Sequence, residues 1–379
     1  MVRNRKVFKK TVSIVNEKST DMYESLVGDK KGFLLESYDK NYDRYTFFGM
    51  EPEEIVTSRG NALVITKADG TEEVREGNPL ERLKEYYSEF HIEKEDEELS
   101  FSGGLVGNLG YDFVRYSEAL PDNNPDEIGI ETIQMMLMTS FLMVDHVAET
   151  LTAVVLEEPS EEGREQAMEK AGQMIKKAME KKECKRNFYH DGKIIKKSDS
   201  IEEYGEKVEK IKHYIREGHV FQTVLSQRWT IETRQTGFEL YKELRELNPS
   251  PYLYYFNYGT FEIIGSSPEM IVKKQENKVF TCPIAGTRKR GKDEAEDKRL
   301  RDELLSDEKE RAEHVMLVDL ARNDMGRISE FGTVKVTQFM EVQNYSHVMH
   351  IVSQVEGRKK GESHPLDLVA SFLPAGTLS

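Results

Sequence analysis

The sequence predicts an α+β protein with antiparallel β-sheets and amphipathic helices. Short apolar segments bounded by Asp, Asn and Gly, such as 32–37, are typical of strands. The turns at 258–259 and 276–277 separate strand-like segments by so few residues that they indicate an antiparallel meander. Ser200 and Glu203 form a capping-box pattern ahead of apolar residues at helical spacing, which predicts that a helix begins there.

The N-terminal part of the chain is predicted to be rich in strands. Residues 1–75 consist mainly of short strand-like segments separated by turns, and a short helix follows over 79–90. The glycine-rich segment 101–116 lacks the spacing of a dinucleotide-binding motif, and glycines within a strand more often mark bulges or a close backbone approach. Two strands around a turn at 145–146 are predicted for 133–157, and a charged amphipathic helix for 160–182.

The polar segment 184–200 is the best candidate for a linker between an N-terminal region, 1–185, and a C-terminal region, 200–379. The C-terminal region mixes strands with capped helices. Helices are predicted for 200–218, 237–247, 304–327 and a segment that ends at Phe372. Strands are predicted for 221–232, 252–259, 261–274, 278–287 and 334–339.

Composition limits the class of protein. A chain of 379 residues with 37% hydrophobic content can form two domains or one large unit with a sizeable core. A net charge of −15 argues against a nucleic-acid partner, because such binding depends on neutralising phosphates. Cys184 and Cys282 give neither a metal-binding spacing nor a disulfide framework. No signal peptide is predicted at the N-terminus, and the apolar run 133–144 is too short to span a bilayer, so we expect a cytoplasmic protein without a membrane partner.

The helix predicted for 304–327 carries two acids that need an explanation. Its apolar residues lie on most sides, which is typical of a buried helix, and Glu313 shares a stripe with Leu317 and Leu320. A buried carboxylate requires a divalent cation, a basic side chain or a proton. Glu310 has two interpretations, since it could equally be the third helical residue after an Asp307 cap.

Two further features stand out against the acidic background. Arg288, Lys289 and Arg290 follow a Gly-Thr pair at a strand end, where they could bind a carboxylate or phosphate or could form a solvated hairpin tip. His347 and His350 are three residues apart, so they point to opposite faces of a strand or share one face of a helix. Together these residues suggest that carboxylates bind Mg²⁺, that the cation binds an anionic substrate, and that an acid and a histidine act on a leaving group.

Six motifs in order along the C-terminal region support a more specific interpretation. They are NPSPYLYYF (248–256), GSSPEMIV (265–272), PIAGTRKRG (283–291), DEKERAEHVMLVDLARND (307–324), YSHVMHIVSQVEG (345–357) and PAGTLS (374–379). With these motifs, and with GFLLES at 32–37, the chain resembles the chorismate-utilising enzymes, and within them the large subunits of anthranilate synthase. The resemblance implies antiparallel sheets packed as a sandwich with helices outside. It also implies conversion of chorismate and ammonia to anthranilate and pyruvate, the first step of tryptophan biosynthesis, catalysed by a Mg²⁺-dependent lyase.

The resemblance assigns roles to individual residues. Glu310 matches the acid that protonates the departing 4-hydroxyl group, and Glu313 matches a Mg²⁺ ligand. The remaining catalytic and substrate-contacting positions are His350, Thr377, Gly286, Thr287, Ala285 and Gln222. The positions that match the feedback site for tryptophan are Ser37, Pro251, Tyr252 and Leu253, so region 1–185 would contribute to regulation and region 200–379 would bind chorismate.

Two positions discriminate among the reactions of the family. Ala285 stands where enzymes resembling aminodeoxychorismate synthase carry a nucleophilic lysine, and Gln222 stands where isochorismate-forming relatives carry a lysine that activates water. Both differences favour amination by free ammonia. The ammonia would come from a glutamine amidotransferase subunit, and L-tryptophan would inhibit. The alternatives are aminodeoxychorismate synthase, another chorismate enzyme, or a non-catalytic fragment that binds tryptophan.

The family pattern continues after PAGTLS with a glycine-rich strand pair, a substrate arginine and a further Mg²⁺-binding glutamate. The printed sequence stops at Ser379. If the polypeptide ends there, we expect an incomplete C-terminal region and little or no activity. The simpler expectation is that the polypeptide continues beyond the printed sequence.

Overall fold

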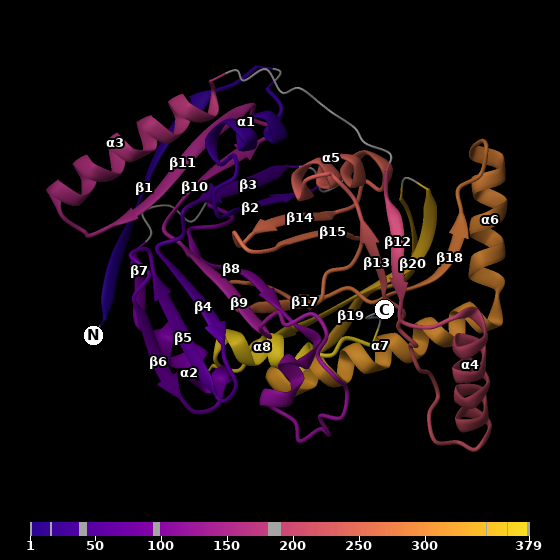
Figure 1. The fold of residues 1–379 in the computed structure, drawn as a ribbon. Coiled ribbons are helices and arrows are strands. Elements are labelled where there is room, and N and C mark those ends of the chain that lie inside the picture. Colours follow the sequence, from indigo (N-terminus) through magenta and orange to yellow (C-terminus); the bar gives the residue numbers. More distant parts are fainter. Residues whose placement is uncertain are drawn as a thin grey trace.

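The structure is a computed structural model of mixed α and β architecture (Figure 1). The residues that it describes form three larger sheets and one two-stranded ribbon. It describes residues 2–15, 17–37, 44–93, 99–180, 191–345, 347–361 and 363–376.

The largest sheet combines strands from both ends of the sequence. All of its strand pairs are antiparallel except that between the first and seventh strands of the chain, which is parallel. Its spatial order is β15 (Glu262–Ser267), β14 (Tyr252–Asn257), β2 (Gly32–Glu36), β3 (Tyr45–Met50), β10 (Ser140–Asp145), β11 (Thr150–Glu157), β1 (Arg3–Ser13) and β7 (Phe90–Glu93). The predicted N-terminal and C-terminal regions therefore share this sheet, whereas their boundary as domains stays a prediction.

A five-stranded antiparallel sheet packs face to face against the eight-stranded one. Phe33 and Phe141 from the larger sheet meet Val106, Met136 and Met138 from the smaller one in a single buried cluster. This arrangement confirms the predicted sandwich, because the inner faces of both sheets supply the core. In spatial order, the smaller sheet contains β6 (Glu72–Glu76), β5 (Ala62–Lys67), β4 (Glu54–Ser58), β9 (Ile133–Met138) and β8 (Gly104–Leu109).

The glycine-rich strand β8 shows why a glycine is needed within it. A Cβ atom at Gly107 would lie 2.2 Å from the backbone oxygen of Gln134 on the neighbouring strand β9. Real Cβ atoms do not approach backbone oxygens so closely, so the strands can pack at this separation only with glycine. The prediction of close backbone approach is confirmed at this position.

Helices cover the outer faces of both sheets (Figure 1). Residues of α1 (Ser19–Leu26), α3 (Glu161–Ala178) and α5 (Gly237–Leu247) form one buried cluster with the outer face of the eight-stranded sheet. The helix α2 (Pro79–Ser88) and the short 3₁₀ helix η1 (Tyr111–Tyr116) pack against the five-stranded sheet. Helix α1 was not predicted from the sequence, because its eight residues carry too few apolar positions to show a clear helical period.

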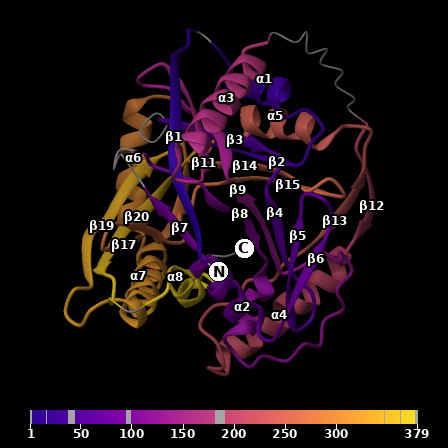
Figure 2. The ribbon, with the colours of Figure 1, turned by 90° about the vertical axis from the view of Figure 1, so that its left-hand side faces the viewer.

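A third sheet carries the predicted catalytic residue His350 and the predicted substrate contacts Ala285, Gly286 and Thr287. The strands β17 (Lys278–Thr281), β18 (Ile284–Lys289) and β19 (Lys335–Asn344) all pair with β20 (Val348–Arg358), and β16 (Lys273–Gln275) pairs with β17. Helices α6 (Glu294–Ser306), α7 (Glu308–Ile328) and α8 (Pro365–Phe372) pack against it. Figure 2 shows this sheet on one side of the molecule, with α7 and α8 beneath it.

An arm projects on the other side of the molecule (Figure 2). It consists of the ribbon β12 (Lys193–Lys197) and β13 (Trp229–Glu232) together with α4 (Ile201–Arg216). The capping box at Ser200 is present as predicted. The predicted strand 221–232 was too long, because only 229–232 find a neighbouring strand for their backbone groups.

Three other predictions need correction. Residues 133–157 form three strands rather than two, with β9 and β10 separated at Thr139. Residues 193–197 form a strand and not a linker, while 181–190 lie outside the described residues. The segment 304–327 belongs to two helices, because the Asp307 side chain accepts a hydrogen bond from the Glu310 amide and caps a new helix.

The helix α7 is also less buried than predicted. Val315 is 43% exposed and Leu320 is 39% exposed, whereas Leu317, Val318, Ala321 and Met325 are buried. One stripe of the helix therefore faces the sheet, and the opposite side faces outward. No helix within the described ranges is long and apolar enough to cross a membrane.

The buried carboxylate of Glu54 allows a test of how the first strand is fixed. Glu54 accepts hydrogen bonds from Arg3 at 2.9 Å and from the Tyr86 hydroxyl at 2.5 Å, and only 5% of its side chain is exposed. Removing one partner of a buried ion pair costs about 3 kcal/mol, so Glu54→Gln should lower the free energy of unfolding by about that amount. Urea denaturation at pH 7 measures this change.

The control is Glu51→Gln, since Glu51 belongs to the exposed pair with Lys30. Exposed pairs contribute about 0.5 kcal/mol or less. Equal losses in the two variants would contradict the role of Glu54 as a buried anchor.

Candidate active site

The pairing of β18 with β20 places the Gly-Thr motif beside a histidine. Ala285 pairs with Ile351 and Thr287 pairs with His350, so Gly286 is an extra residue that forms a β-bulge. Its φ of 79° lies in the left-handed region that glycine adopts without strain. The bulge brings the carbonyl oxygen of Gly286 and the hydroxyl of Thr287 to the same histidine.

The His350 imidazole is fixed by this bulge. Its Nδ1 lies 2.9 Å from Thr287 Oγ1 and 3.3 Å from the carbonyl oxygen of Gly286. Because a carbonyl oxygen can only accept, Nδ1 carries the proton and Nε2 is left with a lone pair. Burial lowers the pKa of His350, and the hydrogen bond to Gly286 opposes that shift. The geometry thus holds a neutral histidine that can accept a proton at Nε2.

Glu310 approaches the same bulge from α7. A Cβ atom built on Gly286 would lie 3.2 Å from Glu310 Oε2, so the carboxylate faces the α-carbon of this glycine. The backbone amide of Glu310 donates to Asp307, as the capping interpretation predicts. The α7 cap contains no reciprocal bond from the Glu310 side chain to the Asp307 amide. The helix cap therefore accounts for the backbone of Glu310 but not for the position of its carboxylate.

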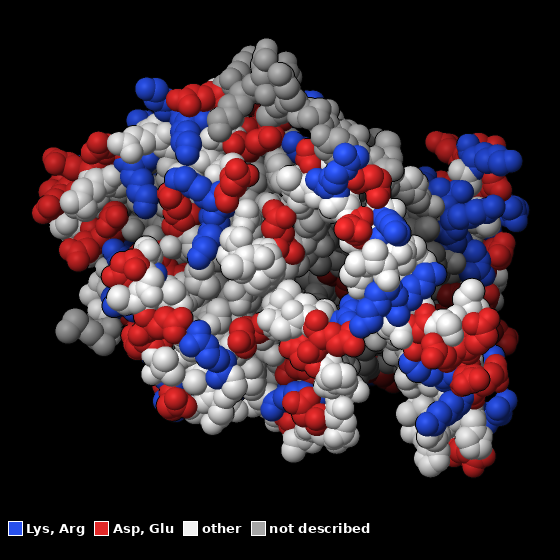
Figure 3. Space-filling view, in the orientation of Figure 1, with Lys and Arg blue, Asp and Glu red and all other residues white. Residues whose placement is uncertain are grey.

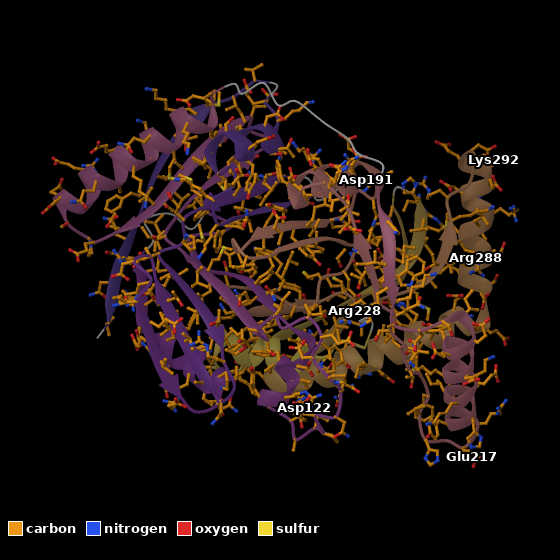
Figure 4. The ribbon with its side chains drawn as sticks, in the orientation of Figure 1. Asp122, Asp191, Glu217, Arg228, Arg288 and Lys292 are labelled. Atoms are coloured by element: carbon orange, nitrogen blue, oxygen red, sulfur yellow. The ribbon has the colours of Figure 1, made fainter. Side chains whose placement is uncertain are left out.

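Arg288 connects the bulge strand to the helices. Its guanidinium donates to Glu303 at 3.0 Å and to Asp307 at 2.8 Å, and lies 3.6 Å from Glu310. Figure 4 shows Arg288 beside α6. The two shorter contacts show that Glu303 and Asp307 are the main ion-pair partners of Arg288. Glu310 is a more distant partner.

Both arginines of the basic tip form ion pairs with acidic side chains. Arg290 forms an ion pair with Asp297, whose carboxylate also accepts a hydrogen bond from the Gly291 amide. Because Arg288 and Arg290 are already paired with acidic side chains, neither predicted interpretation, an anion site or a solvated hairpin tip, fully describes them. Figure 3 shows acidic and basic side chains interspersed over one face of the molecule, without a single large basic surface there.

Glu313 lies half-buried one turn after Glu310 and has a different environment. Its Oε1 accepts a hydrogen bond of 3.2 Å from the Gln222 amide, which reaches it from the arm. The described part of the chain supplies no ion pair to this carboxylate. A half-buried carboxylate with an amide neighbour and no cation suits a hard divalent ion. Among the described residues, no three His, Cys, Asp or Glu side chains gather into a complete metal site.

The other predicted positions lie around the same strands or outside the described ranges. Ala285 is 9% exposed and directly precedes the bulge. His347 precedes β20 and contacts the Leu247 carbonyl oxygen at 3.1 Å, so the two histidines have different partners, as expected at a strand. Thr377 lies outside the described residues.

The residues assigned to tryptophan form a separate pocket. Ser37, Pro251, Tyr252 and Leu253 all line one cavity of about 830 Å³ at the end of the eight-stranded sheet. Aromatic residues complete its walls, among them Tyr45 and Phe47 on β3 and Phe101 just before β8. The buried Ser37 hydroxyl has no hydrogen-bond partner among the described residues. An apolar cavity with one such polar group suits an aromatic ligand that carries hydrogen-bonding groups.

A polar network centred on Glu36, which also lines this pocket, was not predicted from the sequence. Glu36 is 5% exposed and accepts hydrogen bonds from Ser19, from the Tyr241 hydroxyl at 2.6 Å and from Arg245 at 2.8 Å. A glutamate that follows four apolar strand residues offers a signal, since a buried strand would not carry a charge without a partner. Two of the partners, Tyr241 and Arg245, lie 205 and 209 positions away in the sequence, so spacing could not identify them.

Comparisons with known proteins agree with this geometry. A model of the chorismate binding enzyme family matches residues 32–379. Anthranilate synthase component 1 from Acetivibrio thermocellus is 41% identical over 360 residues, which covers 92% of this chain and 73% of the relative. The corresponding protein from Aquifex aeolicus (strain VF5) is 40% identical over 358 residues, with 91% and 72% covered.

Solved structures of chorismate-utilising enzymes are also similar to this chain. The crystal structure of anthranilate synthase component I from Streptococcus pneumoniae TIGR4 matches with a TM-score of 0.78 and 35% identity, covering 89% of this chain and 74% of that one. The menaquinone-specific isochorismate synthase from Escherichia coli shares the fold alone, with a TM-score of 0.62 and 11% identity over 97% of this chain and 74% of that one. The chain belongs to the family of chorismate-binding enzymes, in the group of anthranilate synthase component 1.

Proposed function

We propose that this protein converts chorismate and ammonia to anthranilate and pyruvate, with the β18 bulge as its reaction centre. The observation that carries the proposal is the position of Gly286 between two groups suited to proton transfer. Its α-carbon faces the Glu310 carboxylate, and its carbonyl oxygen accepts the hydrogen bond that orients His350. Acid and base groups at one backbone position suit a reaction that both adds and removes protons.

The two groups would act at different stages. Glu310 would donate a proton to the 4-hydroxyl group of chorismate, which leaves as water while ammonia adds to the ring. Loss of a ring proton and cleavage of the enol ether bond then yield the aromatic ring and release pyruvate. His350, with its free Nε2, is linked by family resemblance to this elimination, and Thr287 helps to orient it. Thr377 stays a predicted contact of the substrate.

Glu313 would hold Mg²⁺ together with groups outside the described residues. When bound, Mg²⁺ would neutralise and orient the ring carboxylate of chorismate, which an acidic protein would otherwise repel. The Gln222 amide orients the Glu313 carboxylate without adding a charge. This arrangement leaves the full negative charge of Glu313 for the cation.

Two positions favour ammonia as the nucleophile, Ala285 next to the bulge and Gln222 beside Glu313. Ala285 has no amine that could attack the ring. The side-chain amide of Gln222 cannot activate water as a lysine amine would. Ammonia would come from glutamine through an amidotransferase subunit, as the designation component 1 of the relatives suggests. Relatives that form isochorismate share the fold, but their water-activating lysine has no counterpart at Gln222.

The cavity lined by Ser37, Pro251, Tyr252 and Leu253 would bind tryptophan and inhibit the enzyme. Its apolar walls suit an indole ring, and the buried hydroxyl of Ser37 would gain a partner from the ligand. The division into a regulatory region 1–185 and a chorismate-binding region 200–379 remains part of the proposal. The shared eight-stranded sheet would connect the two.

Product analysis tests the reaction. The purified chain is incubated with chorismate, an ammonium salt and Mg²⁺, and the products are separated by liquid chromatography and identified by mass. Equal amounts of anthranilate and pyruvate are expected. Aminodeoxychorismate or isochorismate would identify a different chorismate enzyme, and tryptophan binding without turnover would identify a regulatory fragment.

The first variant tests the metal ligand. Glu313→Gln removes the ligand charge, so the Mg²⁺ concentration for half-maximal rate should rise at least about tenfold. Glu308→Gln is the matched control, since Glu308 lies exposed at the start of the same helix. An unchanged Mg²⁺ requirement in Glu313→Gln would remove Glu313 from the metal site.

The second variant tests the tryptophan cavity. Ser37→Ala removes one hydrogen bond of about 1.4 kcal/mol, so about tenfold more tryptophan should be needed for half inhibition. Ser37→Arg should abolish inhibition, because a large cation would occupy the apolar cavity. Turnover without tryptophan should stay normal, as in the exposed control Ser88→Ala. Inhibition at the wild-type concentration in both Ser37 variants would refute the assignment.

A further inference from the structure

A buried histidine on α7 has no role in the chemistry proposed above. His314 follows Glu313 directly, lies one helical turn after Glu310 and is fully buried. A polar ring in an apolar interior requires hydrogen-bond partners, because burial without them costs several kcal/mol in general. The partners of His314 therefore indicate what the histidine does.

The partner of His314 is a serine on β20 that is also fully buried. His314 Nε2 lies 2.6 Å from Ser353 Oγ, and the same oxygen accepts a hydrogen bond of 3.0 Å from the Met340 amide on β19. The backbone amide of Ser353 donates to the Pro283 carbonyl oxygen just before β18. One buried serine thus connects α7 to three neighbouring segments of the sheet.

The hydrogen-bond directions follow from this arrangement. Because the Met340 amide donates to Ser353 Oγ, the serine can donate its own proton to His314 Nε2. The other ring nitrogen, Nδ1, is buried beside the Ala285 backbone and makes no hydrogen bond of normal geometry. Met340 itself has a left-handed φ of 56° at an irregular point of the β19–β20 pairing. Ser353 therefore also stabilises an unusual backbone conformation.

Apolar packing alone would not fix α7 along the sheet. Leu317, Val318, Ala321 and Met325 bury one stripe of the helix, but contacts of this kind are non-directional. A hydrogen bond depends on distance and angle, so the His314–Ser353 pair fixes the position along the helix axis. Glu310 and Glu313 lie within four residues of the pair, and a helix rises only about 1.5 Å per residue.

We infer that His314 and Ser353 form a positioning pair that sets where the Glu310 and Glu313 carboxylates lie relative to the β18 bulge. The inference rests on the proposed roles of those two carboxylates. The space at the bulge is tight, since a Cβ atom on Gly286 would lie 3.2 Å from Glu310 Oε2. A small shift of α7 would therefore displace the acid and the metal ligand together.

The test uses His314→Phe, Ser353→Ala and the double variant in the full chain. A misplacement of about 1 Å can cost about 10²-fold in rate, so each single variant should lower kcat about 10- to 100-fold. The chorismate KM should change less than about threefold, and the Mg²⁺ concentration for half-maximal rate should rise. The double variant should be no worse than the worse single one, because both remove the same interaction. His314→Gln, whose amide can accept the serine proton, should restore part of the rate.

Tyr86→Phe is the control for a purely structural effect. It removes the buried hydrogen bond from Tyr86 to Glu54 in a different core cluster and so costs stability without contacting α7. All variants are assayed at a temperature at which circular dichroism shows them folded. If His314→Phe changes kcat and the Mg²⁺ requirement no more than Tyr86→Phe does, the inference is wrong.

Hydrogen exchange separates this inference from the proposed function. If the wild-type chain does not convert chorismate, the proposed function fails, but the positioning pair can still be tested. Amide exchange over 310–317 should then be faster in His314→Phe than in Tyr86→Phe at equal global stability. Equal exchange in the two variants would overturn the positioning role.

Discussion

The packing of α7 on the β17–β20 sheet is the constraint on which the site depends. The helix must bury one stripe of apolar residues and at the same time bring carboxylates to a backbone bulge. Its N-cap at Asp307 starts the helix close to β18, and Arg288 binds that same cap residue from the strand. Helix start and strand end are therefore joined by one ion pair. This contact places Glu310 beside Gly286 before any ligand is present.

The cavity proposed to bind tryptophan depends on a different long-range connection. The strand β14 enters the large sheet beside β2, so Leu253 and Glu36 become neighbours although they are far apart in the sequence. Arg245 on α5 then pairs with Glu36, which lines the cavity. This salt bridge is almost completely buried on the carboxylate side, and removal of either charge would leave the other without its partner. The salt bridge therefore joins the cavity wall to α5.

Local signals in the sequence predicted the capped helices and the tight turns, whereas the sandwich was implied by the family resemblance. They did not predict which sides of α7 face outward, because exposure of Val315 and Leu320 depends on what the rest of the chain covers. The length of the strand before Glu232 was overestimated for a related reason, since a strand requires a partner as well as propensity. The contact of Gln222 with Glu313 joins residues 91 positions apart and has no local signal at all.

Two glutamates three residues apart on one helix can have different roles because their neighbours differ. Glu310 lies at the edge of a cluster in which Arg288 is bound more closely by Glu303 and Asp307, so its carboxylate is not held in a tight ion pair. Within the part of the chain that the structure describes, Glu313 accepts a hydrogen bond from a neutral amide and forms no ion pair, an arrangement that orients a carboxylate without adding a charge. Spacing on the helix brings both acids to one side of the sheet, and the residues opposite each of them determine its chemistry.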